Sequence, residues 1–216
     1  MKHLLEYAGF RIVLASLAWT PMPIALRLSR FYFRVLDRIV PKLRKAALRN
    51  LQLAALANSD ALVDGVYGHL SRLLVLFSRL PRIQKGNVGR HIRYEGLRNY
   101  QEAKRRGKGI LIATGHFGNW EFSAHAHALL TEPMHVVVRP LDNPRIDALV
   151  ERYRGSSGNQ VITKKDAARG ILRALKEKRS GRNSHRSKLD AGGRCLRRFF
   201  RNAGVRELCI CPPRGA

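Results

Sequence analysis

The sequence has 216 residues, a length that suits a folded protein with a hydrophobic core of its own. Hydrophobic residues make up 45% of the chain, which excludes a disordered polar protein. The chain carries 41 Lys and Arg against 15 Asp and Glu, and its net charge of +26 predicts a polyanionic partner, either nucleic acid or an anionic membrane surface.

The first predicted elements are amphipathic helices near the N-terminus. Residues 10–28 are mostly apolar, but two arginines and two prolines interrupt them, so the segment falls short of the roughly 20 apolar residues of a spanning helix. One sign of charge repeated over several turns favours helices lying at a membrane interface, on its cytoplasmic side, over a buried helix with a solvated basic face. The basic residues, which alternate with Leu, Phe and Val, are Arg27, Arg30, Arg34, Arg38, Lys42, Arg44, Lys45 and Arg49.

A further helix is predicted over residues 60–80, ending at Pro81. From residue 92 onward, short apolar runs alternate with segments of helical periodicity. The expected strands are 92–95, 109–115, 134–139 and 160–162, and the expected helices are 99–106, 143–154 and 166–178. This alternation predicts an α/β domain with a mainly parallel sheet.

The candidate catalytic site follows the strand that ends at Gly115, in the segment His116-Phe-Gly-Asn-Trp-Glu121. Side chains at the C-terminal end of a parallel strand face the crevice where such sheets bind ligands. Because residues five apart on one helix point away from each other, His116 and Glu121 can meet only if the chain bends at Gly118 and Asn119. A carboxylate against one imidazole nitrogen leaves the other as a general base, and without a Ser or Cys nucleophile in the motif this base would activate the acceptor's own hydroxyl.

The stretch GILIATGHFGNWE resembles the His-x4-acid motif of glycerolipid-type acyltransferases. Its flanks narrow the resemblance to the lipid A biosynthesis lauroyl/myristoyl acyltransferase family. The matching flanks are Tyr94–Tyr100, Val138–Pro144, Arg154–Ile162, the 166–178 helix and the basic-apolar N-terminal helices. The resemblance covers roughly residues 1–179, and this ordered set is more specific than the bare motif.

The resemblance implies that His116 deprotonates a hydroxyl of a lipid A precursor while Glu121 orients His116. The hydroxyl would then attack the thioester of an acyl carrier protein donor at the cytoplasmic face of the inner membrane, and no cofactor or metal is implied. Arg139 falls on the family's Arg-Pro motif and is expected either to bind a phosphate or the developing oxyanion, or simply to pair with Asp142. Asn119 and Asp142 are weaker substrate-binding candidates.

The resemblance ends near residue 180, where the family pattern calls for another buried strand and an acidic segment. The chain instead has a basic stretch that contains all three of its cysteines. Allowed codons for residues 183–202, read one nucleotide later, give ILIDQNSMLEEGVYVDFFG, which is the missing segment. We therefore expect a frameshift rather than a lineage-specific basic tail. Sequencing the gene through the codons for residues 177–181 should show a break in the reading frame.

These expectations divide the chain into an N-terminal membrane-associated helical region (1–90), a partial α/β acyltransferase domain (91–179) and an aberrant, disordered basic tail (180–216). The predicted acyltransferase is either active or inactive in this truncated form. Two alternatives stay open: a basic nucleic-acid-binding protein and a non-catalytic membrane-surface protein. The sequence has no helix-turn-helix, zinc-finger or RNA-recognition signature, so no nucleic-acid partner is expected.

Overall fold

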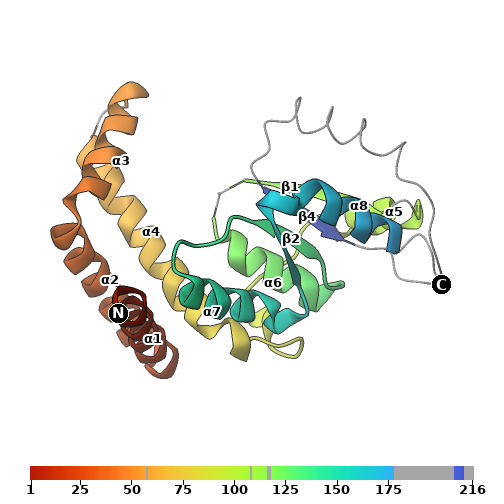
Figure 1. Ribbon diagram of the computed structural model, residues 1–216, viewed down its shortest axis with the longest axis horizontal. Coiled ribbons are helices and arrows are strands. Elements are labelled where there is room, and N and C mark those ends of the chain that lie inside the picture. Colours follow the sequence, from red (N-terminus) through yellow and green to blue (C-terminus); the bar gives the residue numbers. More distant parts are fainter. Residues whose placement is uncertain (57, 108, 116–117, 178–206, 212–216) are drawn as a thin grey trace. The chain divides into compact units, whose positions relative to one another are not determined.

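The computed structural model describes residues 1–56, 58–107, 109–115, 118–177 and 207–211 (Figure 1). The chain forms two compact units, and the boundary between them lies between Arg79 and Leu80. This boundary comes before the one expected at residue 90. The segment after Leu80 belongs with the second unit because Nε2 of His125 donates a hydrogen bond to the carbonyl oxygen of Ile83, at 2.9 Å.

The first unit consists of helices, and prolines mark the starts of α2 and α3. Pro21 precedes α2 with a further proline in its first turn, and Pro41 is the first residue of α3, positions where the missing N–H of proline costs nothing. The bounds of the helices are α1 Lys2–Trp19, α2 Met22–Ile39, α3 Pro41–Leu53 and α4 Ser59–Arg79. Within the described residues, no helix combines the length and the apolar character needed to cross a membrane.

The core of the first unit lies where α1, α2 and α4 meet. Leu17, Ala25 and Val75, one from each helix, have no exposed surface. Ser29 and Ser71 are also fully buried, and the Ser29 hydroxyl donates to the carbonyl oxygen of Ser71 at 2.9 Å. Small residues at these positions let α2 and α4 approach closely, and the hydrogen bond satisfies a hydroxyl that would otherwise be costly to bury.

The second unit is built on a four-stranded sheet. Its spatial order is β1 (Ile110–Thr114), β4 (Glu207–Cys211), β2 (His135–Val138) and β3 (Gln160–Thr163). β2 and β3 are parallel, and β4 is antiparallel to both β1 and β2. Three of the four strands therefore run in the same direction, in agreement with the predicted mainly parallel sheet.

Strand β4 corrects the expectation that residues 180–216 take no part in the folded domain. Cys209 pairs with Ile112 of β1 on one side and with Val136 of β2 on the other, so β4 lies inside the sheet. The prediction is wrong for Glu207–Cys211 because the backbone groups on the facing edges of β1 and β2 need partners, and even a very short apolar run can supply them. The remainder of that tail lies outside the described residues.

The strand predicted over residues 92–95 is also wrong. Ile92 and Tyr94 are half-buried while Arg93 and Glu95 are exposed, so the alternation typical of a strand is real. The segment nevertheless forms no ladder with any described strand. All four residues line a pocket described below, and an extended segment can alternate in burial without pairing with another strand.

Helices cover both faces of the sheet. On one face, Ile171 of α8 (Ala167–Glu177) is fully buried against Val137 of β2, with Leu111 and Ile162 beside them. On the opposite face, Met134 packs with Ile110, Ile112 and Val136 and with Tyr100 of α5 (Leu97–Arg105). Successive residues of β1 and β2 therefore face opposite layers, as the pleat of a strand requires.

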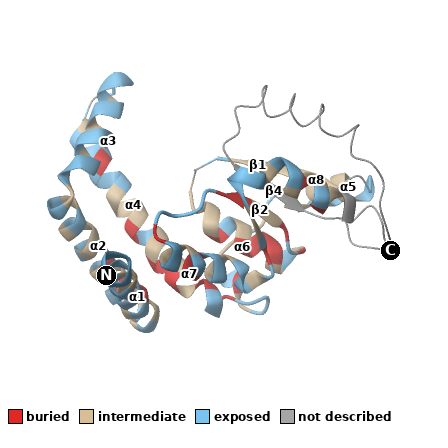
Figure 2. Ribbon diagram, viewed as in Figure 1, coloured by how far each residue is buried: buried red, intermediate tan, exposed pale blue. Residues whose placement is uncertain are grey.

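The most buried helix of the second unit is α6 (Trp120–Leu130), whereas α3 of the first unit has no buried residue (Figure 2). The amide of Asn159 ties the middle of α6 to the residue before β2: it donates to the carbonyl oxygen of Ala124 at 3.1 Å and accepts from the backbone N–H of Met134 at 2.9 Å. Helix α7 (Pro144–Arg154) begins at the predicted position, capped by the side chain of Asn143. The start of α6 and the end of α7 therefore belong to the same compact unit as β1.

Candidate active site

The chain bends sharply between β1 and α6, as the sequence predicts. Gly118 has a φ of +65°, a left-handed conformation that glycine adopts without strain. Asn119 is the N-cap of α6, and its Oδ1 accepts a hydrogen bond from the backbone N–H of Phe122 at 3.0 Å. The helix therefore starts at Trp120, inside the motif, and the predicted bend at Gly118 and Asn119 is confirmed.

Glu121, in the first turn of α6, is held by Arg154, the last residue of α7. The Nε of Arg154 lies 2.9 Å from Oε2 and 3.2 Å from Oε1 of Glu121, and its Nη2 lies 2.5 Å from Oε1. Both side chains are largely buried, with exposed fractions of 22% for Glu121 and 19% for Arg154. This two-pronged ion pair fixes the plane of the carboxylate and balances its charge.

His116 lies outside the described residues, so its predicted contact with Glu121 stays a prediction. A carboxylate has about four lone-pair positions, and the Arg154 guanidinium makes three contacts with Glu121. The Glu121 carboxylate thus keeps acceptor capacity for an imidazole N–H. Glu121 lies directly after the bend that follows β1, which is where a contact with His116 requires it.

Arg154 is the functional side chain that sequence reasoning missed. It stands in the last turn of a predicted helix, where a basic residue is ordinarily explained by its favourable interaction with the helix C-terminus. Glu121 is 33 residues away in the sequence, and no spacing rule connects the two. Only the packing of α7 beside α6 brings them together.

Arg139 and Asp142 follow β2 on the surface of the second unit. Their closest charged atoms are 4.0 Å apart, and the exposed fractions of the two side chains are 81% and 99%. An ion pair as exposed as this contributes little to stability. Asp142 therefore holds the Arg139 guanidinium only weakly. The substrate-binding roles of both residues stay predictions.

Asn119 has a second feature besides its capping role. Its Nδ2 is buried and has no hydrogen-bond partner among the described residues. A buried donor without a partner is costly, which makes this N–H₂ group available to an acceptor atom of a substrate at the bend. Nδ2 is therefore the donor atom through which Asn119 would bind a substrate, as the sequence predicts.

A pocket of about 280 Å³ opens beside the motif. Its residues come from both ends of the His116 segment, Thr114 on β1 and Trp120 on α6, and from the extended segment that was predicted as a strand. The full lining is Ile92, Arg93, Tyr94, Glu95, Ile112, Thr114, Trp120, Ser123, Ala124, Ala126, His127 and Met134. Most of these walls are apolar or aromatic, which suits a hydrocarbon chain better than a charged group.

The two histidines of α6, His125 and His127, are both buried. The Tyr94 hydroxyl lies 2.8 Å from Nδ1 of His127, and the Tyr100 ring meets the His127 ring edge-on with centroids 4.8 Å apart. Burial lowers the pKa of His127 to about 4, against the opposing effect of the Glu132 charge, and burial also lowers the pKa of His125. Both imidazoles are therefore neutral packing groups near neutral pH.

Acid should destabilise the second unit through His127. Between about pH 6.5 and about pH 4 the unfolded chain binds a proton at this position that the folded chain does not, so the free energy of unfolding falls by about 3 kcal/mol as the pH drops through that window. Denaturant unfolding at several pH values measures this slope. His127→Gln should flatten the slope; equal slopes in wild type and His127→Gln would refute the assignment.

Comparison with known proteins adds the identity. A family model described as bacterial lipid A biosynthesis acyltransferase matches residues 2–182. No curated protein and no solved structure matches the chain. The matched segment contains β1, the bend, Glu121 and Arg154, and it ends close to residue 180, where the resemblance in the sequence also ends. The chain belongs to the bacterial lipid A biosynthesis acyltransferase family.

Proposed function

We propose that this chain transfers a fatty acyl group from an acyl carrier protein thioester to a hydroxyl of a lipid A precursor, at the cytoplasmic face of the inner membrane. Family membership supports an acyltransferase with a lipid acceptor. The observation that carries the finer proposal is the carboxylate of Glu121, locked by Arg154 at the bend after β1 and next to a mainly apolar pocket.

The proposed reaction needs one base and no covalent enzyme intermediate. His116 takes the proton of the acceptor hydroxyl as its oxygen attacks the thioester carbonyl, and the tetrahedral intermediate then collapses to the ester. The departing thiolate recovers the proton from His116. Glu121 stabilises the transient imidazolium and keeps its ring oriented, and Arg154 keeps Glu121 in place. The free N–H₂ of Asn119 and the exposed guanidinium of Arg139 are the donors proposed for the oxyanion or a phosphate.

The 280 Å³ pocket is the proposed place for the acyl chain near its carbonyl carbon. Ile112, Ala126 and Met134 line it, as do Thr114 and Trp120, which flank the His116 segment in the sequence. An acyl chain lying there would bury apolar surface against apolar walls, at about 25 cal/mol per Å². The thioester would then lie beside the candidate base.

Donor and acceptor identity can be tested together. The chain, and a version with the reading frame restored near residue 180, would be incubated with labelled acyl carrier protein thioester and a lipid A precursor. Matched reactions replace the donor by the free fatty acid, or the acceptor by a lysophospholipid. Labelled ester should form only with the thioester and the lipid A precursor. Ester formed only on the lysophospholipid would assign a different acceptor and overturn this proposal.

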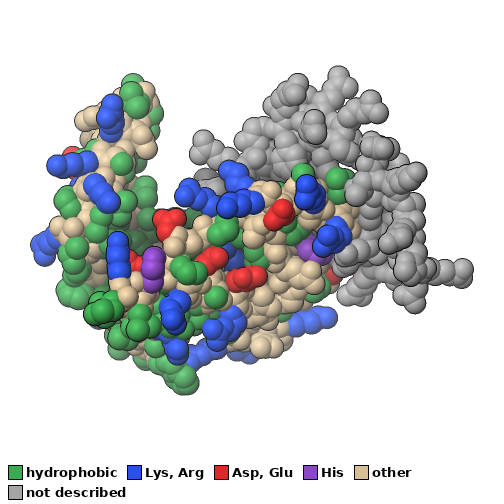
Figure 3. Space-filling view, in the orientation of Figure 1, with side chains coloured by type: hydrophobic (Ala, Val, Ile, Leu, Met, Phe, Trp, Pro, Cys, Tyr) green, Lys and Arg blue, Asp and Glu red, His purple; other side chains and the backbone are tan. Residues whose placement is uncertain are grey.

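Membrane attachment is proposed for an apolar stripe on α1. Leu5, Ile12 and Trp19 follow one another at intervals of seven residues, which places them on one face of the helix. Their exposed fractions are 71%, 68% and 80%, so most of this apolar face is open to solvent. Hydrophobic and basic side chains lie beside one another on the surface of the N-terminal helices (Figure 3). This combination supports a helix lying in a membrane interface.

Replacing Leu5, Ile12 and Trp19 together by serine should weaken binding to anionic vesicles by at least about a hundredfold, because burying each large apolar side chain contributes about 1.5–3 kcal/mol. Vesicle sedimentation measures the partition. Leu141→Ser, an exposed leucine of the second unit, is the matched control and should bind like wild type. Raising the salt should release wild type only in part, since apolar burial persists. Complete release by salt, or equal competition by duplex RNA, would favour the nucleic-acid alternative.

A further inference from the structure

The first unit contains a second pocket, of about 470 Å³, between α2 and α4. It is far more polar than the pocket beside β1 and contains none of the motif residues. Its lining is Arg30, Phe33, Arg34, Asp37, Asp64, Gly65, Tyr67, Gly68 and Arg72. The rings of Phe33 and Tyr67 meet edge-on in its wall, with centroids 6.1 Å apart.

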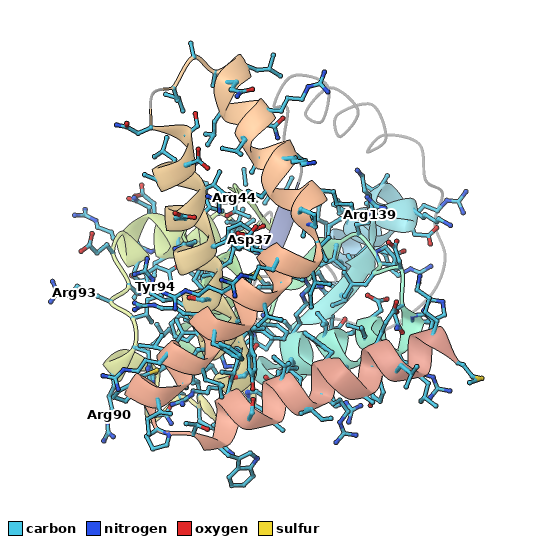
Figure 4. The ribbon with its side chains drawn as sticks, turned by 90° about the vertical axis from the view of Figure 1, so that its left-hand side faces the viewer. Asp37, Arg44, Arg90, Arg93, Tyr94 and Arg139 are labelled. Atoms are coloured by element: carbon cyan, nitrogen blue, oxygen red, sulfur yellow. The ribbon has the colours of Figure 1, made fainter. Side chains whose placement is uncertain are left out.

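The two acids of this pocket are bridged by an arginine of α3. The Nη1 of Arg44 lies 3.1 Å from Oδ2 of Asp37 and 2.8 Å from Oδ1 of Asp64, and its Nη2 lies 3.1 Å from Oδ1 of Asp60. Figure 4 shows Asp37 and Arg44 next to one another. These hydrogen bonds raise the pKa of Arg44, as expected for a guanidinium surrounded by carboxylates.

The three arginines of the pocket have no such partner. Arg30 and Arg34 are four residues apart on the same face of α2, and Arg72 faces them from α4. None of the three forms an ion pair with an acid in the described part of the chain. Together with Arg44 they make four positive charges against the three carboxylates of Asp37, Asp60 and Asp64, so the cluster keeps an excess of positive charge. The three guanidinium groups without an acidic partner are left to bind an anion from solution or from a membrane.

Two glycines keep the pocket open. Gly65 and Gly68 lie within α4, where each costs about 1 kcal/mol relative to alanine. A Cβ atom at either position would meet nothing within 4 Å, so close helix packing does not require them. Their missing side chains instead leave space in front of the arginines, which is what a bound group between α2 and α4 needs.

We propose that this pocket binds the phosphate group of a phosphate-bearing molecule through Arg30, Arg34 and Arg72. Guanidinium groups donate paired N–H bonds to phosphate oxygens, and a cluster of three matches the charge and the number of acceptors of a phosphate ester. The volume exceeds that of phosphate alone, and the Phe33–Tyr67 wall offers an aromatic surface to whatever the phosphate is attached to. The pocket shares no residue with the proposed acyl-transfer site, so this binding does not depend on the proposed reaction.

The test measures binding by the full chain without any acyl donor, so that a failure here leaves the transfer proposal untouched. Inorganic phosphate and glycerol 3-phosphate are the soluble probes, titrated by calorimetry. Arg72→Gln and Arg30→Gln should each weaken binding by about tenfold or more, given what charge-assisted hydrogen bonds contribute. Arg38→Gln removes the same charge from an exposed position of α2 outside the pocket and should bind the two soluble probes like wild type.

Gly68→Leu provides an independent test, because it fills the pocket while improving the helix propensity of α4. This variant should fold at least as stably as wild type and should lose binding. Vesicles of phosphatidylglycerol, compared with vesicles of phosphatidylcholine, distinguish the source. Pocket-dependent binding of vesicles but not of soluble probes assigns a lipid headgroup, and pocket-dependent binding of soluble probes assigns a free phosphate ester.

Three results would overturn the proposal. One is no binding of any phosphate probe. Another is an equal loss of binding in Arg38→Gln and Arg72→Gln, which would mean general charge attraction. The third is undiminished binding by Gly68→Leu, which would mean that the pocket is not the place where phosphate binds.

Discussion

Replacing His116 by alanine is expected to lower the rate of acyl transfer by about 10²–10⁴, to a level indistinguishable from no enzyme. The proposed reaction has no other group to take the proton of the acceptor hydroxyl, and the motif contains no Ser or Cys that could act as a nucleophile in its place. Glu121→Ala should lower the rate by orders of magnitude too, because the imidazole would lose its orientation and the partner of its charged form. Initial rates with the thioester donor measure both effects.

The matched control for this substitution is His3→Ala, an exposed histidine of α1 that should leave the rate unchanged. Vesicle binding and thermal unfolding of His116→Ala should equal those of wild type, since His116 is proposed to act on substrate alone. Wild-type transfer by the His116→Ala variant would remove the proposed base and with it the reaction scheme.

Removing the Arg154 guanidinium is expected to lower kcat by about tenfold to a hundredfold, as does the loss of other groups that orient a functional side chain. Arg154→Ala leaves the largely buried Glu121 carboxylate without its two-pronged partner and free to turn away from the bend. Arg154→Lys keeps the charge but not the planar fork, so it should recover only part of the rate. The KM for the donor should change little, because Arg154 is proposed to contact no substrate.

Arg152→Ala is the control for charge, since this exposed arginine stands in the same last turn of α7. A double substitution separates positioning from direct catalysis. If Arg154 acts through Glu121, the variant with both residues replaced by alanine should be no slower than Glu121→Ala alone. Additive losses would show that Arg154 acts on its own and would contradict the positioning role.

Much of the second unit follows from local sequence signals. The helix over residues 143–154 was predictable because Asn143 and Pro144 are strong start signals and Gly155 follows its end. The bend in the motif was predictable because Gly118 and Asn119 favour left-handed and capping conformations. These features depend on neighbours in the sequence, which is why the sequence alone could indicate them.

Features that depend on packing were not predictable in the same way. The Glu121–Arg154 ion pair joins two helices that are distant in sequence, and β4 pairs with β1 and β2 although its apolar run is very short. The alternation around Tyr94 predicts a strand, yet the segment pairs with no described strand, because a period of two in burial does not require a pairing partner. A local pattern indicates that one face is covered, but it does not indicate which element covers it.

The most direct test of the central claim follows the acyl group itself. The lipid A precursor would be analysed by mass spectrometry after incubation with acyl carrier protein thioester and either wild type or His116→Ala, using both the chain and its frame-restored version. We expect the wild-type protein in at least one of these forms to add the mass of one fatty acyl ester, and His116→Ala to add none. The same mass gain with His116→Ala, or no gain with either wild-type form, would contradict the assignment of this chain as a His116-dependent lipid acyltransferase.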